Sequence, residues 1–191
     1  QIPCIPVLDP VVAAFGKFLN AEVHARPGGQ HVMDAEYFNR IEAMQFVLSH
    51  DDGQSTWDLN EADVILLGVS RTSKTPTCIY LANRGIKAAN VPIVPGCPIP
   101  EKIFEVDQPL IIGLNKDPKR LVEIRRQRLR LFDQDENTDY VNLDAVSREI
   151  NEARRLFNKH NWPTINVSRK SIEETAAQIL QLYQNRTILR D

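Results

Sequence analysis

The stretch that decides the fold is Gly68-Val69-Ser70-Arg71-Thr72-Ser73-Lys74-Thr75. It follows a short apolar run, residues 62–67, and it leads into a segment with the pattern of a helix. A strand, a tight turn of small residues and a helix that begins with Lys-Thr form the phosphate-binding arrangement called a P-loop. Backbone N–H groups and the positive end of the helix hold the phosphate oxygens in such a loop. The nucleotide-binding residues predicted from this pattern are Gly68, Val69, Ser70, Arg71, Thr72, Ser73, Lys74 and Thr75.

Two side chains of the loop have specific expected roles. Lys74 would lie along the terminal phosphates, and the Thr75 hydroxyl would face a bound Mg²⁺. Ser73 departs from the P-loop pattern, which has a glycine there so that the backbone turns closely around phosphate. For these eight residues alone, the alternative is an ordinary strand–turn–helix connection that happens to carry a lysine.

Composition bounds the class of protein. The chain has 191 residues, 42% apolar residues and a net charge of −2, which describes one globular domain, or one domain with an arm. These values exclude a generally basic nucleic-acid binder and a disordered chain. No apolar run approaches the roughly 20 residues that a membrane span needs, and we expect no membrane partner. The three cysteines are far apart, lack paired metal spacing and favour a reduced, cytoplasmic setting.

The N-terminal third has a different character from the rest. The chain begins at Gln1 without a methionine, and its first residues resemble an internal segment, so we expect a piece of a longer protein. Short helices are predicted at 11–19 and 34–48 from the spacing of apolar residues. We therefore expect residues 1–60 to form an N-terminal arm and helix, and residues 61–191 to form the P-loop domain.

An acidic turn, His50-Asp51-Asp52-Gly53, follows the second predicted helix. Two adjacent carboxylates at a helix end are suited to hold Mg²⁺ or to accept a proton. A solvated turn explains the same composition equally well, so Asp51 and Asp52 are candidates on this evidence alone.

From residue 62 onward, predicted strands and helices alternate. The strands are expected at 63–68, 89–94, 109–114 and 163–167, with Pro92 marking an edge strand or a strand end. Asn142 and Ser171 are predicted to cap the last two helices, with Glu174 completing a capping box. The pattern predicts an α/β fold, a P-loop kinase-like parallel sheet with helices on both faces and a ligand at the carboxyl ends of the strands. The predicted buried stripe of the helix after Asn142 is Leu143, Val146, Ile150, Ala153 and Phe157.

The helix predicted at 115–132 is strongly basic. Its position after the third strand and before a polar loop matches the lid region of small P-loop kinases, where arginines stabilise charge on the transferring phosphoryl group. A solvated helix face is the alternative for most of these side chains. The basic residues are Lys116, Lys119, Arg120, Arg125, Arg126, Arg128 and Arg130.

Several long motifs together are specific enough to indicate a family. They are GVSRTSKTPT (68–77), IYLANRGIK (79–87), NVPIVPG (90–96), LVEIRRQRL (121–129) and SIEETA (171–176). With these motifs the chain resembles, over nearly its whole length, the pyruvate, phosphate dikinase regulatory protein family, also called phosphoenolpyruvate synthase regulatory proteins. A Ser-Lys-Thr version of the loop occurs in this family beside the Gly-Lys-Thr version. Family members carry a further N-terminal region that this chain lacks.

The resemblance implies a bifunctional enzyme. Such proteins phosphorylate a threonine of the dikinase or synthase with ADP as donor, and they remove that phosphate with inorganic phosphate, forming pyrophosphate. It implies ADP, inorganic phosphate and Mg²⁺ as ligands and the dikinase or synthase as partner, and it allows a homodimer. His31 and Arg40 are secondary candidates for the side that meets the target protein. The expected catalytic residues are Lys74, Asp52 or Asp51 as base or metal ligand, and Arg71, Arg125 and Arg126 as charge clamps.

Two functions from other classes have the same architecture. A small-molecule kinase of the shikimate or nucleoside type would transfer phosphate from ATP to a metabolite. A non-catalytic sensor would bind ADP and dock on a partner without transferring phosphate. The segment 30–53 favours a dedicated regulator, because it precedes the P-loop domain and could add to its pocket.

Overall fold

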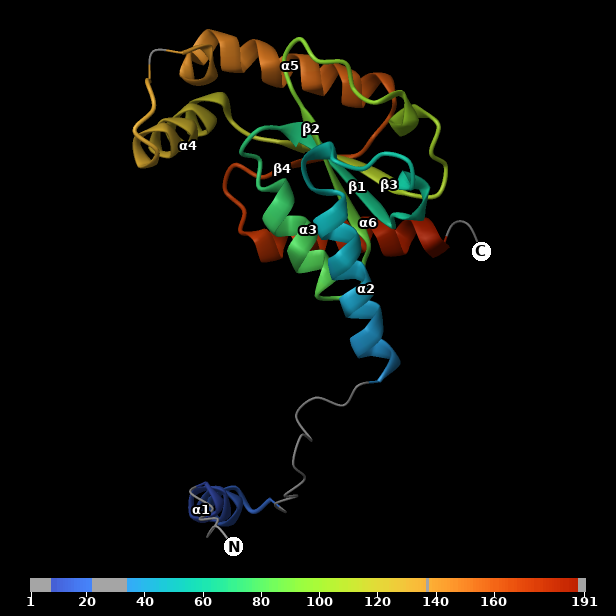
Figure 1. The fold of residues 1–191 in the computed structure, drawn as a ribbon, viewed down its shortest axis with the longest axis vertical. Helices are drawn as coiled ribbons and strands as arrows, with labels where there is room; N and C mark the ends of the chain where they lie inside the picture. Colours follow the sequence, from blue (N-terminus) through green and yellow to red (C-terminus); the bar gives the residue numbers. More distant parts are fainter. Residues whose placement is uncertain (1–7, 22–33, 137, 189–191) are drawn as a thin grey trace, which may run out of the picture. The chain divides into compact units, whose positions relative to one another are not determined.

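The computed structural model describes residues 8–21, 34–136 and 138–188 (Figure 1). Cys4 and His31 therefore lie outside the described residues. None of the helices in the described ranges has the length and apolar character needed to cross a membrane. The helices and strands are α1 (Asp9–Leu19), α2 (Ala35–Ser49), β1 (Val64–Val69), α3 (Lys74–Ala82), β2 (Ala88–Ile93), β3 (Leu110–Asn115), α4 (Pro118–Leu131), α5 (Leu143–Lys159), β4 (Thr164–Asn166) and α6 (Ile172–Ile188), with short 3₁₀ turns η1 (Asp51–Gly53), η2 (Leu59–Glu61), η3 (Glu101–Phe104) and η4 (Asp139–Val141).

The strands form one parallel sheet in the order β2-β1-β3-β4. In its register, Leu67 of β1 lies between Val91 of β2 and Gly113 of β3. Because parallel strands end at the same edge of a sheet, the residues after β1, β2 and β3 converge on one region. The prediction that Pro92 marks an edge strand is confirmed, since β2 is the outer strand beside β1.

Helices cover both faces of the sheet, and each face has its own core. On one face α4 and α5 pack together over β1, β2 and β3 (Figure 1). On the other face α2, α3 and α6 pack against the opposite side chains of β1 and β3. The side chains of β1 are buried on both sides, as expected for a central strand of a parallel sheet. The predicted α/β class, with a covered parallel sheet, is confirmed.

The predicted helix caps are also present. The Asn142 side chain accepts hydrogen bonds from the backbone N–H groups of Asp144 and Ala145, both at 3.0 Å. Ser171 and Glu174 form the reciprocal capping box that opens α6. One position of the α5 stripe was predicted wrongly: Leu143 is 42% exposed, because it lies in the first turn, at the end of the helix. The other four positions are buried.

Packing divides the chain into two units, Gln1–Asp34 and Ala35–Asp191. In the first unit, α1 has no buried residue, and apolar side chains such as Phe15 and Phe18 are exposed. In the second unit, α2 packs on α3 and β2, and through Ala43 and Val47 it contributes to the core. The domain boundary expected between residues 60 and 61 stays a prediction.

Candidate active site

The loop between β1 and α3 has an unusual backbone conformation. Arg71 and Ser73 have φ values of 70° and 64°, in the left-handed region that residues other than glycine rarely adopt. Ser73 therefore occupies the conformation for which the P-loop pattern has glycine. Gly68 meets a different requirement, because a Cβ atom there would lie 2.8 Å from the Leu114 carbonyl oxygen. The Thr72 hydroxyl closes the turn by donating to the Val69 carbonyl oxygen at 2.9 Å.

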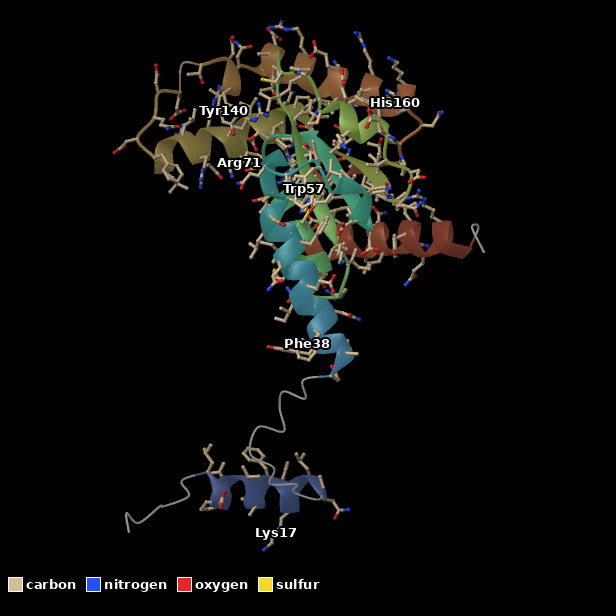
Figure 2. All side chains as sticks on the ribbon, turned by 45° about the vertical axis from the view of Figure 1, so that its right-hand side comes forward. Lys17, Phe38, Trp57, Arg71, Tyr140 and His160 are labelled. Carbon is tan, nitrogen blue, oxygen red and sulfur yellow. The ribbon has the colours of Figure 1, made fainter. Side chains whose placement is uncertain are left out.

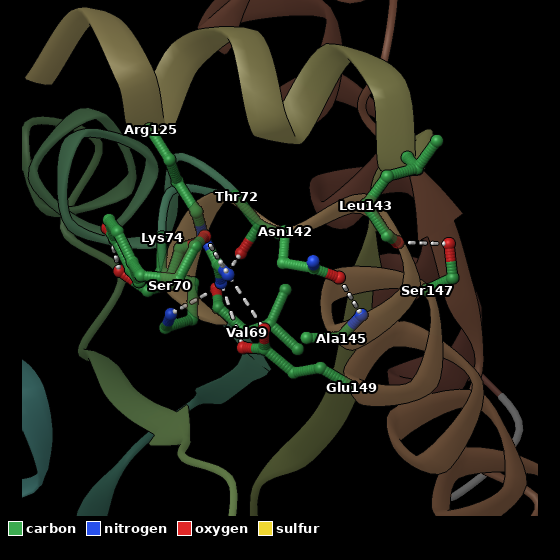
Figure 3. Close-up of polar contacts among 11 residues, drawn as sticks. Val69, Ser70, Thr72, Lys74, Arg125, Asn142, Leu143, Ala145, Ser147 and Glu149 are labelled. Atoms are coloured by element: carbon green, nitrogen blue, oxygen red, sulfur yellow. Dashed lines mark hydrogen bonds and ion pairs between the residues drawn. The ribbon is translucent and has the colours of Figure 1, made fainter. Parts of the chain in front are cut away.

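Two lysines are buried beside this loop. Lys74 is 5% exposed, and its Nζ donates to the Val69 carbonyl oxygen at 3.1 Å (Figure 3). Burial lowers the pKa of Lys74 to about 8, although the nearby Asp52 carboxylate acts in the opposite direction. Lys116, which follows β3, is 6% exposed and donates to the Arg71 carbonyl oxygen at 3.2 Å. Burial also lowers the pKa of Lys116. Neither lysine forms an ion pair with a carboxylate in the described part of the chain.

A cavity of about 510 Å³ lies over the loop, and we call it the phosphate cavity. Three cationic side chains line it against one carboxylate, that of Asp52. Desolvated cations without carboxylate partners attract an anion strongly, because no bound counter-charge must first be displaced. The lining residues are Asp52, Ser70, Arg71, Ser73, Lys74, Thr75, Pro76, Asn90, Pro92, Val94, Lys116 and Ile124.

A cluster of polar side chains joins η1, α3 and β2 at the rim of the phosphate cavity. The Thr75 hydroxyl donates to Asp51 Oδ1 at 2.9 Å. The Asn90 amide nitrogen lies 2.6 Å from Asp51 Oδ1, 3.2 Å from Asp52 Oδ1 and 3.0 Å from Thr75 Oγ1. Asn90 is 1% exposed, and its Oδ1 has no hydrogen-bond partner among the described residues. The two carboxylates predicted from the acidic turn are therefore brought together with Thr75.

The acidic turn is held in place by His50. The His50 carbonyl oxygen accepts a hydrogen bond from the Asn90 backbone N–H at 3.0 Å, which joins the turn to β2. The buried His50 ring stacks on Phe46, and its Nε2 lies 2.6 Å from the Asp58 carboxylate. Burial by itself would raise the pKa of the Asp58 carboxyl group. The pKa is nevertheless lowered, because His50 forms a hydrogen bond with the carboxylate and attracts its charge. Asp52 itself has a φ of 51°, in the left-handed region, so the backbone bends sharply at this residue.

Arg125 lies on the other side of the loop, inside the protein. It is 1% exposed and forms a two-pronged ion pair with Glu149 of α5, at 2.7 and 2.8 Å (Figure 3). Its guanidinium also donates to the carbonyl oxygens of Ser70 and Tyr140, both at 3.2 Å. The Tyr140 ring packs under the guanidinium at 4.4 Å, and the Tyr140 hydroxyl shares a hydrogen bond with Ser70 Oγ. These contacts fix the backbone of the loop at Ser70.

The remaining predicted residues are more dispersed. Arg71 is exposed and lines the phosphate cavity, and it also lines a neighbouring cavity together with Tyr140. Both residues are labelled in Figure 2. Arg126 is exposed on α4 and does not line the phosphate cavity. Arg40 is on α2, where it pairs with Glu36 at 3.2 Å. The loop, Asp51, Asp52 and Arg71 are therefore brought together, whereas Arg126 and Arg40 are not.

Sequence reasoning did not single out four residues as members of the site. Lys116 directly follows β3, and a position after the carboxyl end of a parallel strand is a usable signal for a ligand site; Asn90, in the middle of β2, carries a weaker signal as a polar residue in a buried part of the strand. Glu149 carries a weaker signal, as a carboxylate next to the buried stripe of an amphipathic helix. For Tyr140, in η4, we find no sequence signal.

A larger cavity, of about 880 Å³, lies at the carboxyl end of β4, between the start of α4 and the connection from β4 to α6. Lys116 lines the phosphate cavity, and the next residue, Asp117, lines this one. The connection is ordered by a hydrogen bond of 2.7 Å from the Asp117 backbone N–H to Ser168 Oγ. The lining residues are Asp117, Arg120, Asn166, Ser168, Arg169, Lys170, Glu174, Ala177 and Gln178.

Comparison with known proteins gives consistent matches. A family model described as kinase/pyrophosphorylase matches residues 1–180. A protein of Paramagnetospirillum magneticum is 56% identical over 183 residues, which cover 96% of this chain and 59% of that protein. Relatives from Caulobacter vibrioides and Rhizobium meliloti are 54% and 53% identical, over 95% of this chain and 58% and 67% of their own lengths. All three are named as pyruvate, phosphate dikinase regulatory proteins, and the chain spans about three fifths of the first two.

Proposed function

The chain belongs to the kinase/pyrophosphorylase family, and we propose that it regulates pyruvate, phosphate dikinase, or phosphoenolpyruvate synthase, by reversible phosphorylation. In the first reaction, the β-phosphoryl group of ADP passes to a threonine hydroxyl of the target, AMP leaves, and the hydroxyl proton goes to a base. In the second, inorganic phosphate attacks the phosphothreonine, pyrophosphate forms, and the threonine oxygen regains a proton.

The observation that carries this proposal is the cationic phosphate cavity over the loop. Lys74 and Lys116 are buried there without carboxylate partners, and Arg71 lies at the rim. Both reactions transfer an anionic phosphoryl group, so both need positive charge around the transferred group. In this proposal Lys74 stabilises that group, and Arg71 acts as the charge clamp at the rim.

The polar cluster at the rim fits a bound Mg²⁺. The cluster offers oxygen atoms of the kind that Mg²⁺ prefers as ligands. They belong to the carboxylates of Asp51 and Asp52, the Thr75 hydroxyl and the Asn90 amide. The unpartnered, buried Oδ1 of Asn90 would gain a partner there. Thr75 and one of the carboxylates would hold the ion, which would neutralise charge on the phosphate oxygens.

Of the two carboxylates, Asp52 suits the role of base better. Asp51 already accepts hydrogen bonds from Thr75 and Asn90, at 2.9 and 2.6 Å. Asp52 lines the phosphate cavity and is exposed, so an incoming hydroxyl can reach it. We assign Asp52 the proton from the threonine hydroxyl and Asp51 the orientation of Thr75.

The roles of the arginines differ in this proposal. Arg125 acts as a positioning residue, because its charge is balanced by Glu149 and its free donors hold the Ser70 carbonyl oxygen. Arg126 stays a predicted clamp that would act only after a movement of α4. The nucleoside of ADP belongs in the larger cavity beyond Asp117, which adjoins Lys116 along the chain.

The experiment that tests this function uses ADP labelled at the β-phosphate, incubated with the protein and a dikinase that carries its own phosphoryl group on histidine and none on the target threonine. We expect label in a dikinase threonine, and loss of that transfer in the Lys74→Ala variant. A parallel assay with labelled ATP tests the alternative class. Label that reaches a metabolite from ATP, and no protein from ADP, would identify a small-molecule kinase instead. ADP binding without any transfer would identify a sensor.

A further inference from the structure

A cavity of about 410 Å³ adjoins the phosphate cavity, and we call it the side cavity. The two cavities share Ser70 and Val94 as lining residues. One wall of the side cavity is the end of β2 and the following turn, and the other wall is the first half of α5. The lining residues are Ser70, Ile93, Val94, Pro95, Arg125, Asp139, Tyr140, Ala145, Arg148, Glu149 and Glu152.

The charge of the side cavity differs from that of the phosphate cavity. The Arg125 charge is balanced by Glu149, with which it forms the buried ion pair. That leaves Arg148 against the two carboxylates of Asp139 and Glu152, so the lining is slightly acidic. A phosphate chain would be repelled by such a lining, whereas an uncharged or basic segment would be accepted.

One residue that lines the side cavity also has a polar atom that lacks a partner. Arg125 is 1% exposed, lines the cavity, and has no hydrogen-bond partner at Nε among the described residues. A buried donor without an acceptor is costly, and an oxygen atom of a ligand would relieve that cost. Peptide carbonyl and hydroxyl oxygens are uncharged acceptors of this kind. Ile93, Val94 and Pro95 provide an apolar wall for the neighbouring side chains of a peptide.

We propose that the side cavity binds the segment of the protein substrate that carries the reacting hydroxyl group, with uncharged or basic residues beside it. This inference rests on the proposed function and deepens it, because it locates the acceptor. The acceptor oxygen and the leaving oxygen lie on opposite sides of the transferring phosphorus, so donor and acceptor need adjoining sites. Ser70 lines both cavities, and its carbonyl oxygen accepts a hydrogen bond from Arg125.

The test measures protein-substrate and nucleotide binding separately in two variants. Ala145→Phe fills the side cavity from α5, and Arg148→Ala removes its exposed cation. We expect Ala145→Phe to raise the KM for the dikinase about tenfold or more in both reactions, and Arg148→Ala to change it by about threefold or more. The Kd for ADP, measured by calorimetry, should stay within about twofold of the wild-type value in both.

Matched controls lie on the same helix outside the cavity. Asn151→Phe adds the same bulk, and Arg154→Ala removes the same charge, at exposed positions that do not line the side cavity. Both controls should leave the KM for the dikinase unchanged. Thermal unfolding of all four variants shows whether each is folded.

Three results would overturn the inference. One is an unchanged KM for the dikinase in a folded Ala145→Phe variant while the wild type transfers label normally. Another is weaker ADP binding with an unchanged KM for the dikinase, which would assign the cavity to the donor. Absence of transfer by the wild type would instead overturn the proposed function, and this inference with it.

Discussion

The two flanks of the phosphate loop are built in opposite ways. On the flank toward β2, Asp51, Thr75 and Asn90 form hydrogen bonds at the rim of a cavity, and the Asn90 Oδ1 has no partner in the described chain. On the flank toward α5, Arg125 and Glu149 form a buried ion pair. In the proposed function, the first flank offers oxygen atoms to a ligand, whereas the second holds the loop backbone. In that proposal, pairing decides which buried cations act on the ligand, because Lys74 is buried without a carboxylate partner and Arg125 is buried with one.

The largest expected effect comes from breaking the buried pair. Glu149→Ala leaves the Arg125 guanidinium buried without its counter-charge, so we expect the free energy of unfolding to fall by about 3–5 kcal/mol. Urea denaturation measures this loss. The double variant Arg125→Met, Glu149→Leu removes both charges and should recover most of the stability, yet transfer should stay impaired because Ser70 loses its donor. A Glu149→Ala protein as stable as the wild type would contradict the holding role of this flank.

Removing Lys74 should affect catalysis and leave stability intact. We expect Lys74→Ala to lower transfer from ADP to the dikinase about 10²–10³-fold, since a buried cation beside the transferring group is lost. Its unfolding midpoint should not fall, because burial of the charge is unfavourable in the free protein. Lys119→Ala, at an exposed position on α4 outside the phosphate cavity, is the control. Equal losses in both variants would argue against a specific role for Lys74.

On the flank toward β2, the test residue is Asn90. Asn90→Ala removes the donor shared by Asp51 and Asp52, so we expect transfer to fall about 10–100-fold and the Mg²⁺ concentration for half-maximal rate to rise. Rate measurements across a Mg²⁺ titration separate the two effects. If the rate fell with no change in Mg²⁺ dependence, Asn90 would orient the carboxylates without any link to the metal.

The pH dependence of nucleotide binding should follow Lys74. Its pKa in the free protein is about 8, so the charge that attracts phosphate is present below pH 8 and is lost above it. We expect the Kd for ADP to rise up to about tenfold per pH unit above pH 8. The affinity for ADP thus falls above pH 8, whereas the free energy of unfolding should rise between pH 8 and the ordinary lysine pKa. It rises because the unfolded chain binds the Lys74 proton more tightly than the folded protein in that range.

A Lys74→Arg variant checks the assignment of that pH dependence. Arginine stays charged throughout this range, so its ADP affinity should be nearly flat between pH 7 and pH 9, whatever its absolute value. A fall in affinity shared by both proteins would assign the titration to another group.

The smallest expected effect concerns the loop backbone, which both flanks contact. Ser73 has φ of 64°, so Ser73→Gly removes the strain of a left-handed side-chain residue and should raise the free energy of unfolding by up to about 1 kcal/mol. Ser147→Gly, in the regular helix α5, should lower it by about 0.5–1 kcal/mol. Urea denaturation of both variants compares the signs. A loss of stability in both would show that Ser73 is not strained.

Local patterns in the sequence were sufficient for much of the fold. The apolar runs at β1 and β3, the capping residue Asn142 and the Ser171–Glu174 box each act within a few neighbouring residues. The loop itself was also identifiable, because Lys74 and Thr75 follow a buried strand directly. Thr75 and the two carboxylates of η1 were all named, and a backbone hydrogen bond from Asn90 of β2 to His50 brings the acidic turn beside Thr75.

The chemistry that depends on distant partners was not predictable. Arg125 is one of several basic residues on α4, and only its pairing with Glu149, 24 positions further on, distinguishes it as buried. Asn90 reads as an ordinary polar residue in an edge strand until η1 is placed against it. In both cases the decisive interaction joins two elements whose sequences give no sign of each other.

The contact of Arg125, which is paired with Glu149, with the Ser70 carbonyl oxygen also has a consequence for synthesis on the ribosome. Glu149 follows Lys74 by 75 residues, so the loop emerges long before the ion pair that fixes its backbone. At about 5–20 residues per second, that interval lasts about 4–15 s. During it, β1 and α3 are exposed to the cell without β3, α4 and α5. The nascent chain therefore passes through a period in which the loop has been made but the buried ion pair that holds its backbone has not.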